Sequence, residues 1–217
     1  LDIMQTKQID EVFKKLSKIY PNPKTELKYV NHFTFLVSVV LSAQATDVSV
    51  NKATKNLFKI VKTPKEMIDL GEKKIKTYIK SIGLFNSKAK NLIKLSKILE
   101  KKYNSKVPKN FNKLISLPGV GNKTASVFQN VILNLPRIAV DTHVFRIANR
   151  TGIVQAKTTD ITQLQLERIV PKKWLLRAHH FLILHGRYVC KSQKPLCKQC
   201  SIFHLCEYKG KKIYYNN

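Results

Sequence analysis

The sequence has few acidic side chains. Its 217 residues include 13 Asp and Glu against 40 Lys and Arg, which gives a formal net charge of +27 at pH 7. A compact protein with this imbalance repels itself, and a bound polyanion is the usual compensation, so the charge predicts a nucleic-acid partner. Only six of the basic residues are arginines, and a lysine-rich surface from biased composition explains the same total. The distribution is more informative, because residues 101–140 contain seven Lys or Arg and no Asp or Glu.

Long apolar runs are also absent. The longest, FTFLVSVVLSA at residues 33–43, is too short to cross a bilayer and is interrupted by Thr and Ser. The first ten residues contain no apolar run of the kind that a secretory signal requires. We therefore expect a soluble intracellular protein without a membrane partner, in which residues 33–43 form a buried helix.

The sequence lacks any sustained period-two alternation, so no strand is predicted, whereas helical patterning recurs throughout. Three helix starts are marked by Asp47, by Thr63 with Glu66 three residues later, and by Asn86–Ser87. The pattern predicts an all-α protein of about ten short helices. These helices are expected within residues 9–20, 33–43, 47–61, 63–71, 72–83, 86–103, 110–133 (two helices joined by a turn), 141–152, 159–171 and 175–190.

Cysteine is missing from the first 189 residues. All four cysteines then follow in a C-x6-C-x2-C-x5-C pattern, at positions Cys190, Cys197, Cys200 and Cys206. In an intracellular protein such a cluster favours metal ligands or free thiols over disulfides. Zinc sites commonly use two C-x2-C pairs, whereas only Cys197 and Cys200 form one here, so the spacing leaves zinc and a four-iron–four-sulfur cluster open. Lys191 and Lys194 lie in the first interval, where they offset thiolate charge and form a loop suited to phosphate contact.

A glycine turn, LPGVGNKTA at residues 117–125, joins the two helices expected within 110–133. Gly119 and Gly121 allow a sharp turn and close backbone approach, so N–H groups from Val120 onward are candidates to bind a nucleic-acid phosphate. The Walker spacing of a nucleotide-binding loop is absent. An ordinary turn between two helices accounts for the glycines equally well.

Lys123 and Asp141 are the candidate reactive side chains. Lys123 falls in the first turn of a helix, where the dipole disfavours a cation by roughly 0.3–1 kcal/mol. This favours the free amine that a nucleophilic lysine requires, although a phosphate contact suits the position too. Asp141 ends the acid-free window and precedes a helical run, so it is either an N-cap or a carboxylate with a chemical task. Such a task is to stabilise a developing sugar cation or to take a proton from Lys123 or water.

Several motifs occur together in this chain. They are LSAQATDVSVNKAT (41–54), TYIKSIGLFNSKAKNLI (77–93), LPGVGNKTA (117–125), AVDTHVFRIANR (139–150), HHFLILHGRYVC (179–190) and the cysteine tail. As a set they resemble the bacterial endonuclease III family of helix–hairpin–helix DNA glycosylases with AP-lyase activity. The resemblance extends from about residue 23 to about residue 209, and residues 154–170 diverge most.

The resemblance implies a two-domain architecture with a DNA groove between the domains. Residues 24–134 would form a six-helix domain that contains the helix–hairpin–helix at 111–130. Residues 1–23 and 135–217 would form the second helical domain, with a four-iron–four-sulfur cluster as cofactor in the loop 190–206. The four cysteines would be the ligands of this cluster.

The resemblance also implies roles for single residues. Lys123 matches the catalytic lysine and Asp141 the catalytic aspartate, and related adenine-specific glycosylases lack that lysine, which indicates a bifunctional enzyme. Gln44 and Leu84 match side chains that fill the space left when a damaged nucleotide is flipped out of the duplex. From the residues alone, Gln44 would be a helix-end residue and Leu84 a core residue. The remaining DNA contacts would come from Gly119, Val120, Gly121, Lys191 and Lys194.

The activity implied is removal of oxidised pyrimidines from double-stranded DNA, followed by cleavage 3′ to the abasic site through a Lys123 Schiff base. The protein would act as a monomer on damaged or abasic duplexes in the bacterial cytoplasm, at the nucleoid. Two other classes fit part of the sequence. A non-catalytic nucleic-acid-binding protein with a structural metal explains the charge, hairpin and cysteines but gives Asp141 no task. An iron–sulfur electron-transfer protein does not explain the glycine turn.

Overall fold

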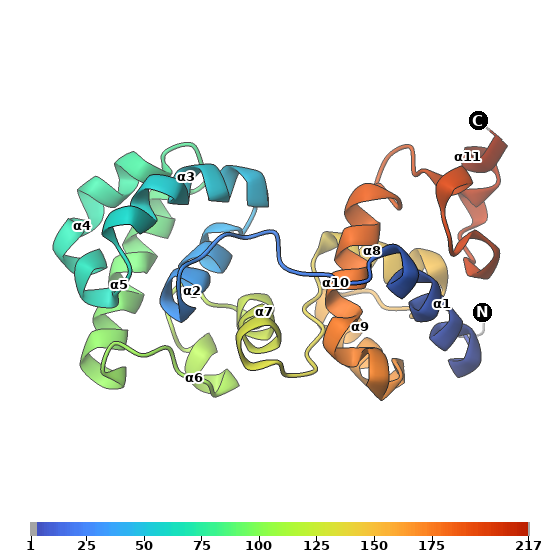
Figure 1. Ribbon diagram of the computed structural model, residues 1–217, viewed down its shortest axis with the longest axis horizontal. Helices are drawn as coiled ribbons and strands as arrows, with labels where there is room; N and C mark the ends of the chain where they lie inside the picture. The colour runs from blue at the N-terminus through green and yellow to red at the C-terminus, as the bar shows by residue number, and fades with distance from the viewer. Residues whose placement is uncertain (1–3, 217) are drawn as a thin grey trace. The chain divides into compact units, whose positions relative to one another are not determined.

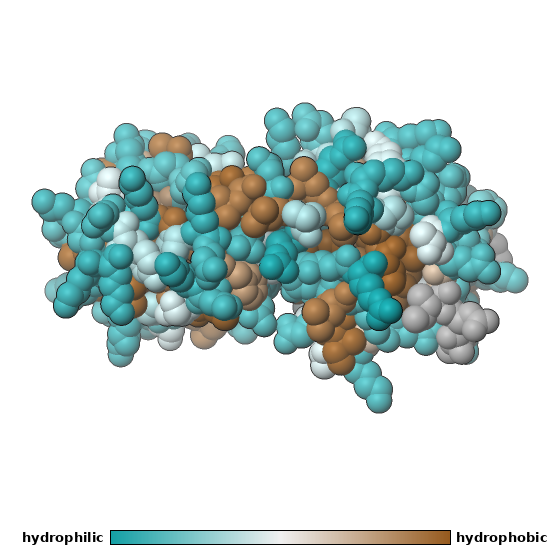
Figure 2. Space-filling view, turned by 90° about the horizontal axis from the view of Figure 1, so that it is seen from below, coloured by the Kyte–Doolittle hydropathy of each residue, from teal (hydrophilic) through white to brown (hydrophobic). Residues whose placement is uncertain are grey.

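A computed structural model describes residues 4–216, and these residues form helices, turns and irregular segments without a β-strand (Figure 1). The all-α prediction is therefore confirmed. The chain divides into two compact units, of which unit 1 combines residues 1–24 with 134–217 and unit 2 comprises residues 25–133. No helix within residues 4–216 is long and apolar enough to cross a membrane. Hydrophilic residues cover most of the face drawn in Figure 2.

Unit 2 is built around a helix that is apolar on all sides. Every residue of this helix after His32 is buried, as expected for a segment without a polar face. Three other helices of the unit pack against it directly, namely α3 (Asp47–Ile60), α5 (Phe85–Tyr103) and α7 (Asn122–Leu133). The elements of unit 2 are α2 (His32–Leu41), α3 (Asp47–Ile60), α4 (Pro64–Ile79), α5 (Phe85–Tyr103), α6 (Phe111–Ile115) and α7 (Asn122–Leu133).

The helix starts in unit 2 follow the sequence signals in part. Thr63 and Glu66 form the predicted capping box, in which each side chain accepts a bond from the other residue's backbone N–H. Thr46, rather than Asp47, caps α3 by accepting from the Ser49 N–H. The Asn86–Ser87 prediction is wrong as well, since α5 begins at Phe85, directly after a residue in the left-handed region.

The predicted helices 63–71 and 72–83 form one element, α4, with a break inside it. Gly71 interrupts the helix with φ 77° and ψ 155°. This left-handed backbone favours glycine, because a Cβ would crowd the following carbonyl oxygen. The predicted division into two helices is therefore confirmed, with the break at Gly71.

Unit 1 joins the first helix of the chain to its last third. The apolar stripe of α1 (Thr6–Ile19) is buried in this unit, and the ring centroid of its Phe13 lies 6.4 Å from that of Phe181 in α10 (Lys172–Tyr188). Three short 3-10 turns and a final helix follow the first cysteine and were not predicted. The elements of unit 1 are α1 (Thr6–Ile19), α8 (Thr142–Thr151), α9 (Thr159–Ile169), α10 (Lys172–Tyr188), η1 (Cys197–Gln199), η2 (Phe203–Leu205), η3 (Lys209–Lys211) and α11 (Ile213–Asn216).

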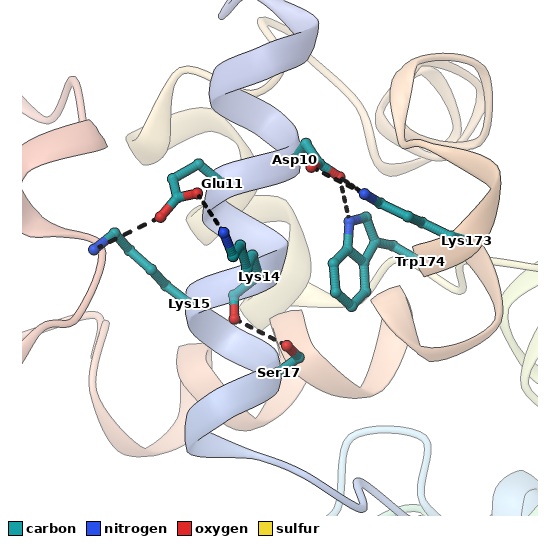
Figure 3. Close-up of polar contacts among 7 residues, drawn as sticks. All are labelled: Asp10, Glu11, Lys14, Lys15, Ser17, Lys173 and Trp174. Carbon is teal, nitrogen blue, oxygen red and sulfur yellow. Dashed lines mark hydrogen bonds and ion pairs between the residues drawn. The ribbon is translucent and has the colours of Figure 1, made fainter.

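A polar contact attaches α1 to the start of α10 (Figure 3). The Trp174 indole N–H donates to Asp10 at 2.7 Å, and the Lys173 ammonium lies at the same distance from that carboxylate. These two donors, the lysine foremost, hold the pKa of Asp10 below its usual 3.8. Glu11 pairs with Lys14 and Lys15 at 3.9 and 4.0 Å, which is a solvent-exposed arrangement of little energetic weight. The indole contact therefore specifies where α1 lies on α10.

Candidate functional site

The glycine turn between α6 and α7 depends on Gly119. Its φ is 81°, and a Cβ at this position would lie 3.2 Å from the Cβ of Asn91 and 3.3 Å from Cγ1 of Val40. The turn therefore packs closely on α5 and α2, which only glycine permits. Gly121 differs, since its φ lies outside the left-handed range and no atom is within 4 Å of a Cβ built there. Any need for glycine at position 121 must come from what approaches the turn from outside.

Val120 serves the turn itself. Its side chain is buried, and its N–H donates to the Leu117 carbonyl at 3.0 Å. This N–H group is therefore committed within the turn. The candidate donors for an anion are the first N–H groups of α7, beyond Gly121, because the first N–H groups of a helix take no part in its intrahelical bonds.

Lys123 lies in the first turn of α7 and is exposed, whereas residues 124–130 of the helix are buried. No acidic side chain is present in this first turn. Lys123 is therefore attached at the positive end of the helix dipole, in the turn whose N–H groups would attract an anion.

Asp141 caps α8. Its Oδ1 accepts hydrogen bonds from the N–H groups of His143 and Val144, both at 2.9 Å. The predicted N-cap role is thereby confirmed, and these bonds fix the carboxylate at the helix start. Lys123 belongs to unit 2 and Asp141 to unit 1, so each is positioned by its own unit.

The four cysteines line one cavity of unit 1. Ile147 of α8, His185 of α10 and Ile202 contribute to the same wall. A single zinc ion with bonds of about 2.3 Å would gather the sulfurs around one point. Within residues 4–216, no three His, Cys, Asp or Glu side chains form such a group. The four thiols thus line a common cavity and are not gathered around one point.

Burial raises the pKa of three of these thiols. It raises the pKa of Cys200 to about 12 and shifts the pKa values of Cys197 and Cys206 in the same direction. As free thiols these groups are therefore protonated at neutral pH. Since metal ligands must be thiolates, occupation of the cavity by a metal would release protons.

Two arginines of α8 hold the cysteine segment in place. Arg146 donates to the carbonyls of Gly186 and Cys190 at 2.7 and 2.9 Å. Arg150 donates to the carbonyls of Lys191 and Ser192 at 2.7 and 2.9 Å. Sequence reasoning missed both residues, although they lie four positions apart, and so on one helix face, in the quoted motif AVDTHVFRIANR.

His185 is a further residue that the sequence analysis did not single out. Burial lowers the pKa of this histidine to about 4, so its ring is neutral at pH 7. Its Nε2 lies 3.4 Å from the sulfur of Cys200. The signal available was its place in HHFLILHGRYVC, where it precedes the first cysteine by a little more than one helical turn.

Gln44 and Leu84 occupy two exposed turns of unit 2. Both have left-handed backbone conformations, with φ values of 53° and 59°. Gln44 follows the end of α2, as the helix-end interpretation predicted, whereas Leu84 is 58% exposed and the core interpretation is wrong. The two turns adjoin, since a Cβ on Gly83 would lie 3.9 Å from the Gln44 carbonyl oxygen. Lys191 and Lys194 are also exposed, in unit 1.

The comparisons with known proteins agree with these motifs. Residues 37–172 match the HhH-GPD superfamily of base excision DNA repair proteins. Endonuclease III of Rickettsia conorii is 56% identical over 94% of this chain and 98% of its own length. Endonuclease III of Escherichia coli (strain K12) is 49% identical over 93% of this chain and 95% of its own length.

Two solved structures show the same fold. A trapped endonuclease III–DNA covalent intermediate matches with a TM-score of 0.92 and 40% identity, covering 97% of this chain and 100% of that one. A non-covalent endonuclease III–DNA complex matches with a TM-score of 0.92 and 39% identity, covering 99% and 100%. Fold and motifs thus define a base excision repair protein of the HhH-GPD class. Within that class, the chain belongs to the endonuclease III family.

The different demands on the two glycines are testable by alanine substitution. Gly119→Ala is expected to lower the free energy of unfolding by about 1–3 kcal/mol, because alanine is strained at a left-handed φ. Gly121→Ala is the matched control, and it should change that free energy by less than about 1 kcal/mol. Urea unfolding of both variants measures the difference, and equal losses would contradict the role given to Gly119.

Proposed function

We propose that this chain is a base-excision-repair DNA glycosylase with AP-lyase activity, which removes oxidised pyrimidines from duplex DNA. The proposal rests chiefly on one feature, the exposed residue Lys123 at the start of the hairpin's second helix. Among the structural relatives, one is described as a trapped covalent intermediate with DNA. A covalent intermediate requires a nucleophile on the protein, and Lys123 is the candidate in this chain.

Lys123 attacks C1′ of the extruded nucleotide with the lone pair of its Nζ. The C1′–N bond to the base breaks, and the base leaves with the electron pair and takes up a proton. The sugar ring then opens at the C1′–O4′ bond, O4′ takes up a proton to become a hydroxyl, and a protonated Schiff base remains between Nζ and C1′. At an existing abasic site, the aldehyde condenses with the same amine and releases water.

The Schiff base makes the C2′ proton acidic. Loss of this proton forms a C2′–C3′ double bond and expels the 3′ phosphate, which cuts the strand 3′ to the lesion by β-elimination. Asp141 assists by accepting the proton that Lys123 loses and by stabilising positive charge on the sugar. Its two bonds from α8 hold the carboxylate in place while it does so.

DNA is bound through its backbone and through the space that the flipped nucleotide leaves. The first N–H groups of α7, next to Gly121, bind a phosphate, and Lys191 and Lys194 add charge that is independent of sequence. Gln44 and Leu84 enter the base stack, for which their exposure on adjoining turns suits them.

The cysteine cavity is proposed to hold a four-iron–four-sulfur cluster. Four thiols around one cavity match the four corner ligands of such a cluster, and Arg150 Nη1 lies 3.9 Å from the Cys190 sulfur, where it offsets thiolate charge. When bound, the cluster would supply four iron–sulfur bonds that fix the segment 190–206. The residues of that segment, Lys191 and Lys194 among them, would then be presented to DNA in a defined conformation.

The substrate is duplex DNA with a damaged pyrimidine or an abasic site, and the protein is proposed to act as a monomer in the bacterial cytoplasm, at the nucleoid. A non-catalytic nucleic-acid-binding protein is the alternative. It would use the same hairpin and charge, but it would form no covalent bond to DNA.

Borohydride reduction in the presence of abasic-site DNA tests the central claim. Wild type should be trapped as a covalent adduct, and Lys123→Ala should abolish this adduct because the amine is lost. Lys113→Ala, which removes an exposed lysine of α6, is the matched control and should be trapped like wild type. Absence of an adduct with wild type would favour the non-catalytic alternative. Much weaker binding of abasic DNA by Lys123→Gln would make Lys123 chiefly a phosphate contact.

Asp141→Asn separates capping from chemistry. Asparagine caps helices as well as aspartate, so the melting temperature should stay close to that of wild type. Loss of the charge and of the proton acceptor should slow single-turnover base excision by about 100-fold or more. Thermal melting and single-turnover kinetics measure the two effects. Unchanged kinetics with Asn would reduce Asp141 to a helix cap.

Iron and acid-labile sulfide analysis tests the cofactor. The purified chain should contain about four of each per molecule, and Cys206→Ser should lose most of both, because one ligand is gone. Ser192→Ala, in the same segment, should retain them. One zinc ion per chain in place of iron would contradict the proposal.

A further inference from the structure

One lysine of unit 2 is buried rather than solvent-exposed. Lys88 lies in the first turn of α5 and is only 5% exposed, although most lysines of this chain are on the surface. Its ammonium donates to the carbonyl oxygens of Leu41 at 2.9 Å and Ala43 at 2.7 Å. Burial lowers the pKa of this lysine. A buried cation is costly unless it is well bonded, so these two acceptors are what keep the ammonium inside.

The acceptors belong to the end of another helix. Leu41 is the last residue of α2, and Ala43 lies in the turn that follows. The last carbonyls of a helix have no intrahelical partner, and a cation is favoured there by the dipole. Since the last turn of α2 contains no basic residue of its own, Lys88 of α5 supplies the charge from 45 or more residues away.

This contact links the two turns proposed to enter DNA. Gln44 directly follows Ala43, and Leu84 directly precedes the helix that carries Lys88. The backbone N–H of Lys88 donates to the carbonyl of Leu84 at 3.0 Å and so bonds to the Leu84 turn. Lys88 therefore holds both turns, one through its ammonium and the other through its backbone.

The same helix also contacts the hairpin. Asn91, one turn after Lys88, lies against Gly119. A displacement of the Gln44 turn relative to α5 is thus a displacement relative to the segment that leads into Lys123. Both turns have left-handed residues that tertiary contacts must hold in place.

We propose that Lys88 is a positioning residue that ties the Gln44 and Leu84 turns into one rigid element, so that both side chains enter the duplex together when a nucleotide is extruded. The inference rests on the proposed function. Lys88 touches neither the reacting atoms nor Lys123 in this role. It determines how well the protein holds an opened duplex, and the amine of Lys123 reacts as before once the sugar is accessible.

Two substrates separate positioning from chemistry. With a duplex that contains 5-hydroxycytosine, Lys88→Met should slow single-turnover excision by about tenfold or more, because misplacement of binding groups is costly in rate. With a single-stranded abasic oligonucleotide, which has no base stack to fill, borohydride trapping should stay within about twofold of wild type. Lys88→Arg, which keeps charge and donors, should recover most of the duplex activity. Lys90→Met, which removes an exposed lysine of the same helix, should resemble wild type on both substrates.

A double-mutant comparison tests whether Lys88 acts through the two turns. In a Gln44→Ala/Leu84→Ala background, adding Lys88→Met should cost less than about twofold more in duplex excision, because the side chains that it positions are gone. An additive loss in that background, or equal losses on both substrates, would show that Lys88 only stabilises the unit and would overturn the proposal. Should Lys88→Met be unfolded at the assay temperature, Lys88→Gln takes its place with the same expectations.

Fluorescence gives a readout that needs no catalysis. We place a 2-aminopurine opposite a tetrahydrofuran abasic analogue. Its fluorescence should rise when wild type or Lys90→Met fills the abasic gap and unstacks the 2-aminopurine. At saturating protein, Lys88→Met should give a clearly smaller rise, and a rise equal to that of wild type would overturn the proposal. Because this signal requires binding only, it decides the role of Lys88 even if wild type forms no borohydride adduct, which is the result that would reject the proposed function.

Discussion

The unsatisfied backbone groups at helix ends are the constraint on which this protein depends. A chain of short helices has many such ends, and each leaves N–H or carbonyl groups that need a partner. The candidate functional residues occupy these ends: Lys123 and Asp141 at helix starts, Gln44 after a helix end, Leu84 before a start. A helix end is fixed in position yet open to an approaching ligand, which is the combination that DNA chemistry requires.

Charged side chains from distant parts of the sequence bond to the backbone groups at several of these helix ends. Arg146 bonds to the last turn of α10, and Arg150 bonds to the segment that follows it. Both lie on α8, the helix that Asp141 caps. One helix therefore positions the aspartate at its start and the cysteine segment along its side. In unit 2, α5 has the role that α8 has in unit 1, because it contacts the turn after α2 through Lys88 and the hairpin through Asn91.

Features that depend on local sequence were predictable, and features that depend on distant contacts were not. The buried helix at 33–43, the Thr63 capping box and the Asp141 cap follow from a few neighbouring residues and were confirmed. The exposure of Leu84 was not predicted from its residue type, because a leucine between helices resembles core. Lys88 is one lysine among many in the sequence, and its burial depends on carbonyls of another helix. The chemical roles of Lys123, Asp141 and the cysteines stay predictions from motif and resemblance.

The division of the chain has a consequence for the order of folding. Unit 2 is continuous, from residue 25 to residue 133, whereas unit 1 needs both the first residues and the last third of the chain. When synthesis has passed residue 133, unit 2 is complete, whereas α1 is the one helix of unit 1 that has been made. Until α10 emerges, α1 has neither Phe181 to cover Phe13 nor Trp174 to bond Asp10. Until α10 is synthesised, a nascent chain of this protein thus exposes the apolar stripe of α1, and this is the interval in which it is most prone to aggregate.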